Sequence, residues 1–250
     1  MYFQKQLNYG KKYIGMRIRS NTYQKVCHLI SSNICDLVRR HSALYLVKGY
    51  EKPTLGLATG STPIGIYQEL SIRGNSLHTN FSDTITFNLD EYVGLNGWHP
   101  QSYNYFMYKH LFTNLTFKKR FFPSVNGVDL YDDLIEAYGG IDIQILGIGT
   151  NGHIAFNEPG TPRESKTHVV DLTENTIKDN SRFFDSIEDV PKQATTMGIE
   201  SIMRAKRIYL VAQGKHKKDI LEKAMYGDIT PEVPASFLQE HDNLKVFYCD

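Results

Sequence analysis

Four short segments of this sequence combine glycine, hydroxyl, carboxylate, imidazole and amine groups in patterns that can bind an anion or transfer protons. The first is Ala58–Pro63 (ATGSTP), in which Gly60 permits a tight turn and Thr62 is suited to cap a helix. Free backbone N–H groups at the positive end of that helix, with the nearby hydroxyls of Thr59 and Ser61, would form a cradle for phosphate. The segment lacks the lysine of a P-loop and therefore does not indicate a nucleoside triphosphate. An ordinary strand-to-helix turn is the alternative interpretation.

Two acidic residues follow an apolar run directly in the second segment. Asn88–Tyr92 (NLDEY) places Asp90 and Glu91 at the end of a predicted buried strand, where carboxylates are costly unless they are paired or hydrated. Neighbouring side chains in an extended chain point to opposite sides, so these two are not expected to form a carboxylate pair. We expect one to face a pocket and the other to face the protein, with a solvated loop or a helix cap as the alternative.

The third segment is a glycine-rich turn that carries a histidine. Gly147–His153 (GIGTNGH) ends another apolar run and is followed by Asn157–Gly160 (NEPG). Its glycines would let the backbone approach a ligand closely, and His153 with Glu158 would form an acid–base pair near neutral pH. The spacing matches G-x-G-x-x-G, but no helix is predicted directly after it, so a dinucleotide site is not indicated. A structural role is the alternative for this histidine. It is the role expected for His28, His41, His78 and His110.

The fourth segment, Gly214–Lys218 (GKHKK), opens a predicted helix. Lysines at a helix start oppose the helix macrodipole, which indicates an anion to be bound there. A solvated run of charges is the alternative.

The elements that must position these segments alternate between short apolar runs and helical patterns. The predicted strands are Tyr13–Arg19, Thr54–Ala58, Thr84–Leu89, Ile141–Leu146, Ile208–Ala212 and Lys245–Tyr248. The predicted helices are 21–38, 63–72, 101–112 and 130–138, with another beginning near Lys215. This alternation predicts an α/β fold with a mainly parallel, doubly wound (Rossmann-like) sheet and helices on both faces. Each of the four segments follows a strand, and the carboxyl ends of parallel strands share one edge of the sheet, so we expect the segments to converge there.

Composition excludes several other classes of function. Lys and Arg number 28 against 27 acidic residues, a net charge of +1, so no general attraction to nucleic acid or to an anionic membrane is expected. Three cysteines without metal-ligand spacing (Cys27, Cys35 and Cys249) indicate reduced thiols in a cytoplasmic protein. No apolar run reaches the ~20 residues that span a bilayer. We expect residues 1–12 to be a loose extension and residues 13–250 to form a single domain.

Together the segments resemble the glucosamine-6-phosphate deaminase family. The resemblance rests on the stretches LGLATGSTPIGIYQEL, FNLDEYVGL, HPQSYNYFM, ILGIGTNGHIAFNEPG, NSRFF and VPKQATTMGI, and it extends from about Met16 to the end of the chain. It implies conversion of glucosamine 6-phosphate to fructose 6-phosphate and ammonia, without a metal or an organic cofactor. It also implies a mobile lid over about residues 161–189.

The resemblance implies a role for each matching residue. Asp90 corresponds to the base that moves a proton between C2 and C1 of the sugar, and His153 to the ring-opening acid–base group supported by Glu158. The phosphate group would be held by Thr59, Gly60, Ser61 and Thr62, with the cations of Arg182 and Lys217.

Two departures from the family pattern bear on mechanism and assembly. Asn151 stands where many relatives carry aspartate; an amide can orient His153 but cannot offset an imidazolium charge, so more of that role falls to Glu158. Only Arg163 and Lys166 follow the NEPG segment closely, whereas allosteric hexameric members carry a basic cluster there and a longer C-terminal tail. A non-allosteric monomer or low homo-oligomer is therefore expected.

Two other readings of the same segments are open. A 6-phosphogluconolactonase would share the phosphate turn and the glycine-rich histidine turn, but the DEYVGL and FNEPG stretches favour the deaminase. A non-catalytic sugar-phosphate sensor would need a DNA-binding segment, for which the chain has no basic block.

Overall fold

The computed structural model describes residues 19–48, 52–76, 79–182 and 184–249. The extension expected over residues 1–12 lies outside this range, as does all of the predicted strand Tyr13–Arg19 except its last residue, which belongs to the short strand β1 (Arg19–Ser20).

A seven-stranded sheet forms the centre of the fold, and all of its strand pairs are parallel. The strand order is β1-β10-β9-β6-β2-β3-β5. Besides β1, its strands are β2 (Thr54–Leu57), β3 (Ile85–Asn88), β5 (Lys119–Phe121), β6 (Ile143–Leu146), β9 (Ile208–Gln213) and β10 (Leu244–Cys249). The predicted parallel, doubly wound sheet is confirmed; of its strands, β5 was not predicted.

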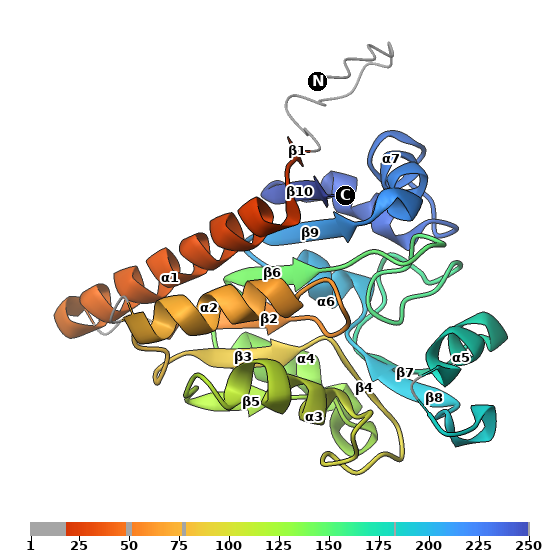
Figure 1. The fold of residues 1–250 in the computed structure, drawn as a ribbon, viewed down its shortest axis with the longest axis horizontal. Helices are drawn as coiled ribbons and strands as arrows, with labels where there is room; N and C mark the ends of the chain where they lie inside the picture. Colours follow the sequence, from red (N-terminus) through yellow and green to blue (C-terminus); the bar gives the residue numbers. More distant parts are fainter. Residues whose placement is uncertain (1–18, 49–51, 77–78, 183, 250) are drawn as a thin grey trace.

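Helices cover both faces of this sheet (Figure 1). One face packs against α1 (Tyr23–Lys48), α2 (Ile64–Ser76), α3 (Tyr103–Met107) and the π-helix η1 (Tyr108–Phe112). The other packs against α4 (Val128–Ala137), α6 (Ile199–Met203), α7 (Lys218–Tyr226) and the 3-10 helix η5 (Pro234–Glu240). Both faces need a covering layer because each strand carries apolar side chains on both sides. In β9, Tyr209 and Val211 point to the first face, and the second face receives Ile208, Leu210 and Ala212.

A second, smaller sheet was not predicted. It joins β4 (Asp90–Tyr92), β8 (Gln193–Thr196) and β7 (His168–Asp171) in antiparallel pairs. It lies beyond the carboxyl edge of the main sheet, next to α5 (Glu174–Ser181) and the short η3 (Ile187–Asp189) (Figure 1). A small separate core packs against this sheet and is made of Tyr92 and Ala194 from its strands together with Phe156 and Leu172.

The strand order creates a crevice between two neighbouring strands. After β2 the chain continues to β3 and β5 on one side, whereas after β6 it continues to β9 and β10 on the other. Ligands of open α/β sheets bind where the connections diverge in this way, at the carboxyl ends of the strands. The turn after β2 and the glycine-rich turn after β6 both begin at this point.

Four predicted helices have different limits from those expected. The helix expected over 21–38 continues to Lys48 as α1, and the one expected over 63–72 continues to Ser76 as α2. The helix expected over 101–112 divides into α3 and the π-helix η1. The helix expected near Lys215 begins as a 3-10 turn, η4 (Lys215–Lys217), and becomes α-helical at Lys218. Within the described residues, no helix is long and apolar enough to cross a membrane.

Candidate active site

The turn after β2 has the tight geometry predicted for a phosphate cradle. Gly60 has a φ of +89°, in the left-handed region that glycine adopts without strain. Two tyrosines fix the backbone on either side of it: the Tyr67 hydroxyl donates to the Ala58 carbonyl, and the Tyr23 hydroxyl donates to the Thr62 carbonyl at 2.7 Å. The Tyr23 hydroxyl also accepts the Gly65 N–H at 2.9 Å. A cap at Thr62, as predicted, would start the helix at Pro63. Helix α2 instead begins at Ile64, one residue later.

Asp90 begins β4 of the small sheet and is buried, with 7% of its surface exposed. Its Oδ1 atom has no hydrogen-bond partner among the described residues. Burial raises the pKa of Asp90 to about 8, and the charge of Glu91 adds to the increase. A buried carboxyl group that lacks partners and changes protonation near neutral pH is suited to exchange a proton with a ligand.

Glu91 faces the protein, as expected for one member of this acidic pair. Its carboxylate accepts the backbone N–H groups of Tyr92 and Tyr103 at 2.9 Å and of Asn104 at 2.8 Å. Two of these donors belong to the first turn of α3, whose N–H groups have no partner within the helix. Glu91 therefore anchors β4, and with it Asp90, to the start of α3.

The ionisation of Asp90 predicts how stability changes with pH. The folded protein keeps the Asp90 proton up to a pH of about 8, whereas an unfolded aspartate loses it near 3.8. Between these values the folded state binds more protons, so the free energy of unfolding falls as pH rises through this window. We expect Asp90→Asn, which cannot ionise, to be more stable than the native chain at pH 9 by an amount on the order of a few kcal/mol.

Thermal unfolding of both chains at pH 4 and pH 9 measures this difference. The variant should melt about 5 °C or more above the native chain at pH 9 and close to it at pH 4. Equal melting temperatures at both pH values would show that Asp90 is not buried as described.

The glycine-rich turn after β6 places His153 beside Glu158. The imidazole lies against Gly149 so closely that any Cβ there would be 2.3 Å from the ring. Asn151 links the two functional side chains, because its Oδ1 accepts the His153 backbone N–H at 3.1 Å and its Nδ2 donates to Glu158 Oε2 at 2.7 Å. Nδ1 of His153 is 3.6 Å from Oε2 of Glu158, the separation of an ion pair rather than of a direct hydrogen bond.

Glu158 and Asp90 both carry a carboxyl group, but their environments shift its pKa in opposite directions. Burial alone would raise the pKa of Glu158, yet contacts with His153, Thr176 and Asn151 lower it to about 2. Glu158 therefore stays ionised over the whole range in which Asp90 titrates. Two carboxyl groups whose pKa values differ in this way are suited to different roles, one as a fixed negative charge and one as a proton acceptor.

Two backbone hydrogen bonds and one from a side chain tie three of the four segments together. The Leu89 N–H donates to the Leu57 carbonyl at 3.0 Å, and the Leu89 carbonyl accepts the Met197 N–H at 2.7 Å. The Met197 carbonyl in turn accepts from Nδ2 of Asn157, the residue before Glu158. One chain of hydrogen bonds thus joins Leu57, Leu89 and Asn157. These residues directly precede the phosphate turn, Asp90 and Glu158.

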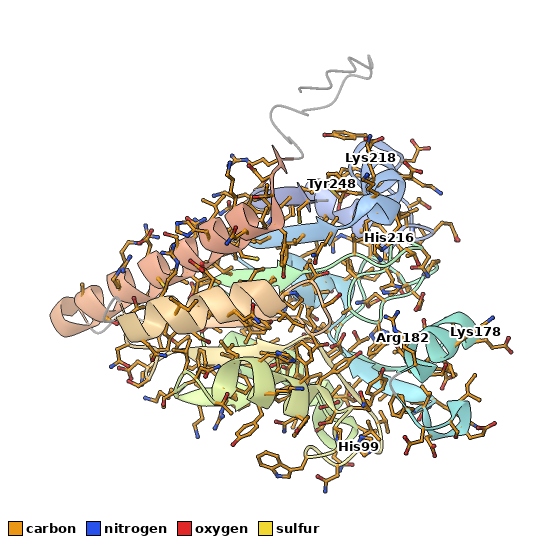
Figure 2. All side chains as sticks on the ribbon, viewed as in Figure 1. His99, Lys178, Arg182, His216, Lys218 and Tyr248 are labelled. Atoms are coloured by element: carbon orange, nitrogen blue, oxygen red, sulfur yellow. The ribbon has the colours of Figure 1, made fainter. Side chains whose placement is uncertain are left out.

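The fourth segment adjoins the third through α7. Gly152 packs against Val233 and against Ile220, which lies two residues into α7, and its carbonyl accepts the Ala235 N–H at 2.9 Å. Lys217 directly precedes α7. Figure 2 shows His216 where β9 passes into α7, and Arg182 directly after the end of α5, whereas Lys178 points outward from α5.

One contact in this region was missed from the sequence. The hydroxyl of Thr176, in the first turn of α5, donates to Oε1 of Glu158 at 2.7 Å. Near Thr176 the sequence indicates only the start of a helix, through Thr173, which caps α5 and accepts the Thr176 N–H. That signal predicts a helix start but not the tertiary contact. No group of three His, Cys, Asp or Glu side chains in the described part of the chain could hold a metal ion.

Residues 20–247 match the family model described as glucosamine-6-phosphate isomerases/6-phosphogluconolactonase. The chain belongs to this family. A family member from Oceanobacillus iheyensis, named glucosamine-6-phosphate deaminase, is 48% identical over 238 residues, which cover 92% of this chain and 91% of the relative. Another with the same name, from Lactococcus lactis subsp. lactis, is 53% identical over 199 residues, which cover 77% of this chain and 83% of the relative.

Two solved structures have a fold similar to that of this chain. One described as a monomeric glucosamine-6-phosphate deaminase has a TM-score of 0.84 at 37% identity and covers 93% of this chain and 97% of its own. A 6-phosphogluconolactonase from Shewanella baltica has a TM-score of 0.70 at 18% identity, with coverage of 95% and 99%. The second likeness shows the common fold alone, whereas the first also carries sequence similarity.

Proposed function

We propose that this chain is a glucosamine-6-phosphate deaminase, which converts glucosamine 6-phosphate and water to fructose 6-phosphate and ammonia. Its relatives at about half identity carry this name over nearly the whole chain. The structural observation that carries the proposal is the pair of carboxyl groups at one sheet edge, Asp90 with a raised pKa and Glu158 with a lowered one beside His153.

Phosphate binding would hold the sugar at the sheet edge. In this proposal the turn at Thr59–Thr62 receives the phosphate oxygens, and Arg182 and Lys217 supply the opposing charge. The phosphate lies remote from the reacting carbons, so its binding energy can be used to position C1 and C2.

Ring opening is the first chemical step. His153 would take the proton from the O1 hydroxyl and return a proton to the ring oxygen O5, which breaks the C1–O5 bond and leaves an aldehyde at C1. The ionised Glu158, 3.6 Å from Nδ1, would stabilise the imidazolium that forms in between. Asn151 holds both groups by its two hydrogen bonds, although its amide adds no charge of its own.

Proton transfer from C2 to C1 follows. Asp90 would remove the C2 proton, which the neighbouring aldehyde makes acidic, and would return it to C1, while a proton passes from the C2 ammonium group to the O1 oxygen. The ammonium group on C2 favours the ionised form of Asp90, because an opposite charge close by lowers a carboxyl pKa. The resulting C2 imine gains water and loses ammonia, which leaves the ketone of fructose 6-phosphate. Every step in this scheme uses only side chains and water.

The segment over residues 161–189 would act as the lid in this scheme, within a single domain of residues 13–250. Its helix α5 contacts the site through Thr176, which donates to Glu158. Closing the segment over the sugar would bring Arg182 to the phosphate and exclude water. The link from Thr176 to Glu158 would then make the position of the lid and that of the supporting carboxylate depend on each other.

Replacing Thr176 tests this link. We expect Thr176→Val, which keeps the shape but removes the hydroxyl, to lower kcat about tenfold with little change in KM, since a hydrogen bond to a charged group contributes about 1.5–3 kcal/mol. Thr176→Ser, which keeps the hydroxyl, should retain most of the activity. Steady-state kinetics of the two variants give the comparison, and an equal loss in both would count against a role for the hydrogen bond.

The assay for the proposed function measures ammonia and fructose 6-phosphate formed from glucosamine 6-phosphate, with hydrolysis of 6-phosphogluconolactone followed in parallel. We expect the first reaction and not the second. Rapid lactone hydrolysis without ammonia release would instead assign the chain to the lactonase branch.

We further propose that the chain acts in the cytoplasm as a monomer or low homo-oligomer. The solved relative with a TM-score of 0.84 is described as monomeric. The three cysteines, Cys27, Cys35 and Cys249, are buried and form no disulfide among the described residues, which suits a reducing compartment. Sedimentation equilibrium of the purified chain measures the assembly state.

A further inference from the structure

A cavity with a basic lining opens at the end of the main sheet opposite the candidate active site. Its volume is about 400 Å³. It is lined by Asn33, Asp36, Arg39, Arg40 and Arg207. Asn33, Asp36 and Arg40 are spaced i, i+3 and i+7, so they share one face of α1. Arg207 directly precedes β9 and therefore lies at the amino edge of the sheet.

This cavity is separate from the candidate active site. Arg207 comes before β9, whereas Lys217 follows it, and the six residues of the strand span about 20 Å. None of the five lining residues belongs to the four segments at the carboxyl edge.

Two buried donors in the lining have no acceptor. Nδ2 of Asn33 and Nε of Arg207 are both buried without a hydrogen-bond partner among the residues that the structure describes. The contact that Arg207 does make, from Nη1 to the Tyr209 hydroxyl, is long at 3.4 Å. Buried polar groups are nearly always satisfied, so these two donors leave hydrogen-bonding capacity unused beside the cavity.

The charge of the lining is positive. Asp36 is the only acid among the five residues; its carboxylate accepts from Arg39 at 2.5 Å, and its carbonyl accepts from Nε of Arg40 at 3.2 Å. With the Asp36–Arg39 pair neutralised, the charges of Arg40 and Arg207 remain. Lys245 of β10 adds a further positive charge close to Arg207. Burial lowers the pKa of Lys245, and the charges of Arg207 and Arg19 lower it further.

The lining therefore offers donors and two net positive charges to a ligand that accepts hydrogen bonds. Guanidinium groups match the oxygens of phosphate in geometry as well as in charge. We propose that this cavity binds the dianionic phosphate group of a small molecule, at a site independent of the active site. Its volume exceeds the needs of one phosphate group and lies within the range of small-molecule pockets, which favours an ester with an organic part.

Phosphate titration of the full chain tests the proposal. Isothermal titration with inorganic phosphate at low ionic strength is expected to detect two sites per native chain, one at each edge of the sheet. Lys217→Met should remove the site at the carboxyl edge, and Arg207→Gln should remove the other. The doubly substituted chain should bind none.

Further variants separate loss of binding from loss of folding. In the Lys217→Met background, Asn33→Leu and Arg40→Gln are each expected to weaken the remaining site about tenfold, since each removes one donor. Arg204→Gln, which removes an exposed arginine paired with Glu200 on α6, is the matched control and should leave both sites intact. Arg207→Gln should also leave kcat and KM for glucosamine 6-phosphate unchanged.

The outcomes distinguish this proposal from the proposed function. Absence of phosphate binding in Lys217→Met, or residual binding that Arg207→Gln leaves unchanged, would overturn the second site. If Lys217→Met removes no site while Arg207→Gln does, the second site stands and the phosphate clamp of the active site fails. Repeating the titration with glycerol 3-phosphate identifies the source: tighter binding than inorganic phosphate assigns an ester, and equal binding assigns free phosphate.

Discussion

Asp90→Asn is expected to lower kcat for ammonia release roughly 10³- to 10⁴-fold, while KM changes by less than about threefold. The carboxamide fills the same buried space but cannot accept the C2 proton, so isomerisation stops at the open-chain aldehyde. Substrate binding should persist, because the proposed phosphate contacts come from the turn after β2, from Arg182 and from Lys217. Coupled assays of ammonia and fructose 6-phosphate give kcat, and isothermal titration with substrate gives affinity.

An exposed acid provides the control for this variant. Asp83 lies just before β3 and pairs at the surface with Lys52 and Lys118, so Asp83→Asn should leave activity unchanged. A melting temperature of Asp90→Asn above that of the native chain at pH 9 would exclude misfolding as the cause of its inactivity. Ammonia release at the native rate by this variant would remove Asp90 from the mechanism.

His153→Gln is expected to slow turnover of glucosamine 6-phosphate about 10²-fold. Glutamine keeps the backbone N–H that donates to Asn151, so the turn retains its shape, but its amide cannot exchange a proton between O1 and O5. An analogue without the C5 hydroxyl, which cannot close the six-membered ring, bypasses this step. The variant should process that analogue at close to the native rate.

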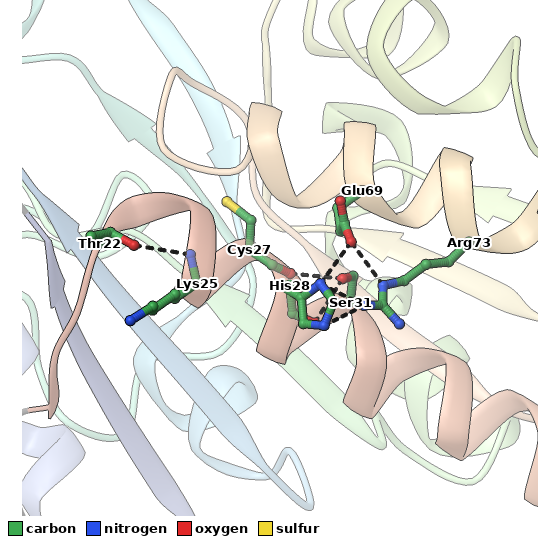
Figure 3. Close-up of polar contacts among 7 residues, drawn as sticks. All are labelled: Thr22, Lys25, Cys27, His28, Ser31, Glu69 and Arg73. Atoms are coloured by element: carbon green, nitrogen blue, oxygen red, sulfur yellow. Dashed lines mark hydrogen bonds and ion pairs between the residues drawn. The ribbon is translucent and has the colours of Figure 1, made fainter.

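The comparison between the two substrates tests whether His153 acts in ring opening. Equal slowing of the ring-forming and the open-chain substrate would contradict a function in ring opening. His28→Gln serves as the control, because His28 is a surface side chain of α1 that contacts Glu69 and Arg73 of α2 (Figure 3). Loss of that surface contact should leave the kinetics with both substrates unchanged.

The main sheet could be predicted because its strands are short apolar runs between helical patterns. Strand β6 (IQIL) and the first five residues of β9 (IYLVA) are buried throughout, as expected for a parallel sheet covered on both faces. The edge at which the candidate segments lie could also be predicted, because ligands of such sheets bind at the carboxyl ends of the strands. The π-helix η1 could not be foreseen, since its apolar residues fit the periodicity of an ordinary helix.

The small sheet could not be predicted from the sequence. Strand β7 (HVVD) is nowhere fully buried and β8 (QATT) is largely polar, so neither gives a clear apolar signal. Asp90 pairs with Thr196, more than 100 residues later in the chain, and no local pattern reports such a pairing. The sequence therefore placed Asp90 at the end of a strand of the main sheet, whereas the chain leaves that sheet at Asn88 and Asp90 begins a strand of another.

Membership of Asp90 in the small sheet has a consequence for heat inactivation. The core beneath that sheet consists of four buried side chains, whereas the two clusters on the main sheet each contain more than twenty. Little apolar surface opposes its opening, so β4, β7 and β8 should exchange their amide hydrogens by subglobal opening while β2, β6 and β9 stay protected. Catalysis should therefore fail at a lower temperature than the one at which the chain unfolds, and a bound sugar phosphate should narrow the gap between the two.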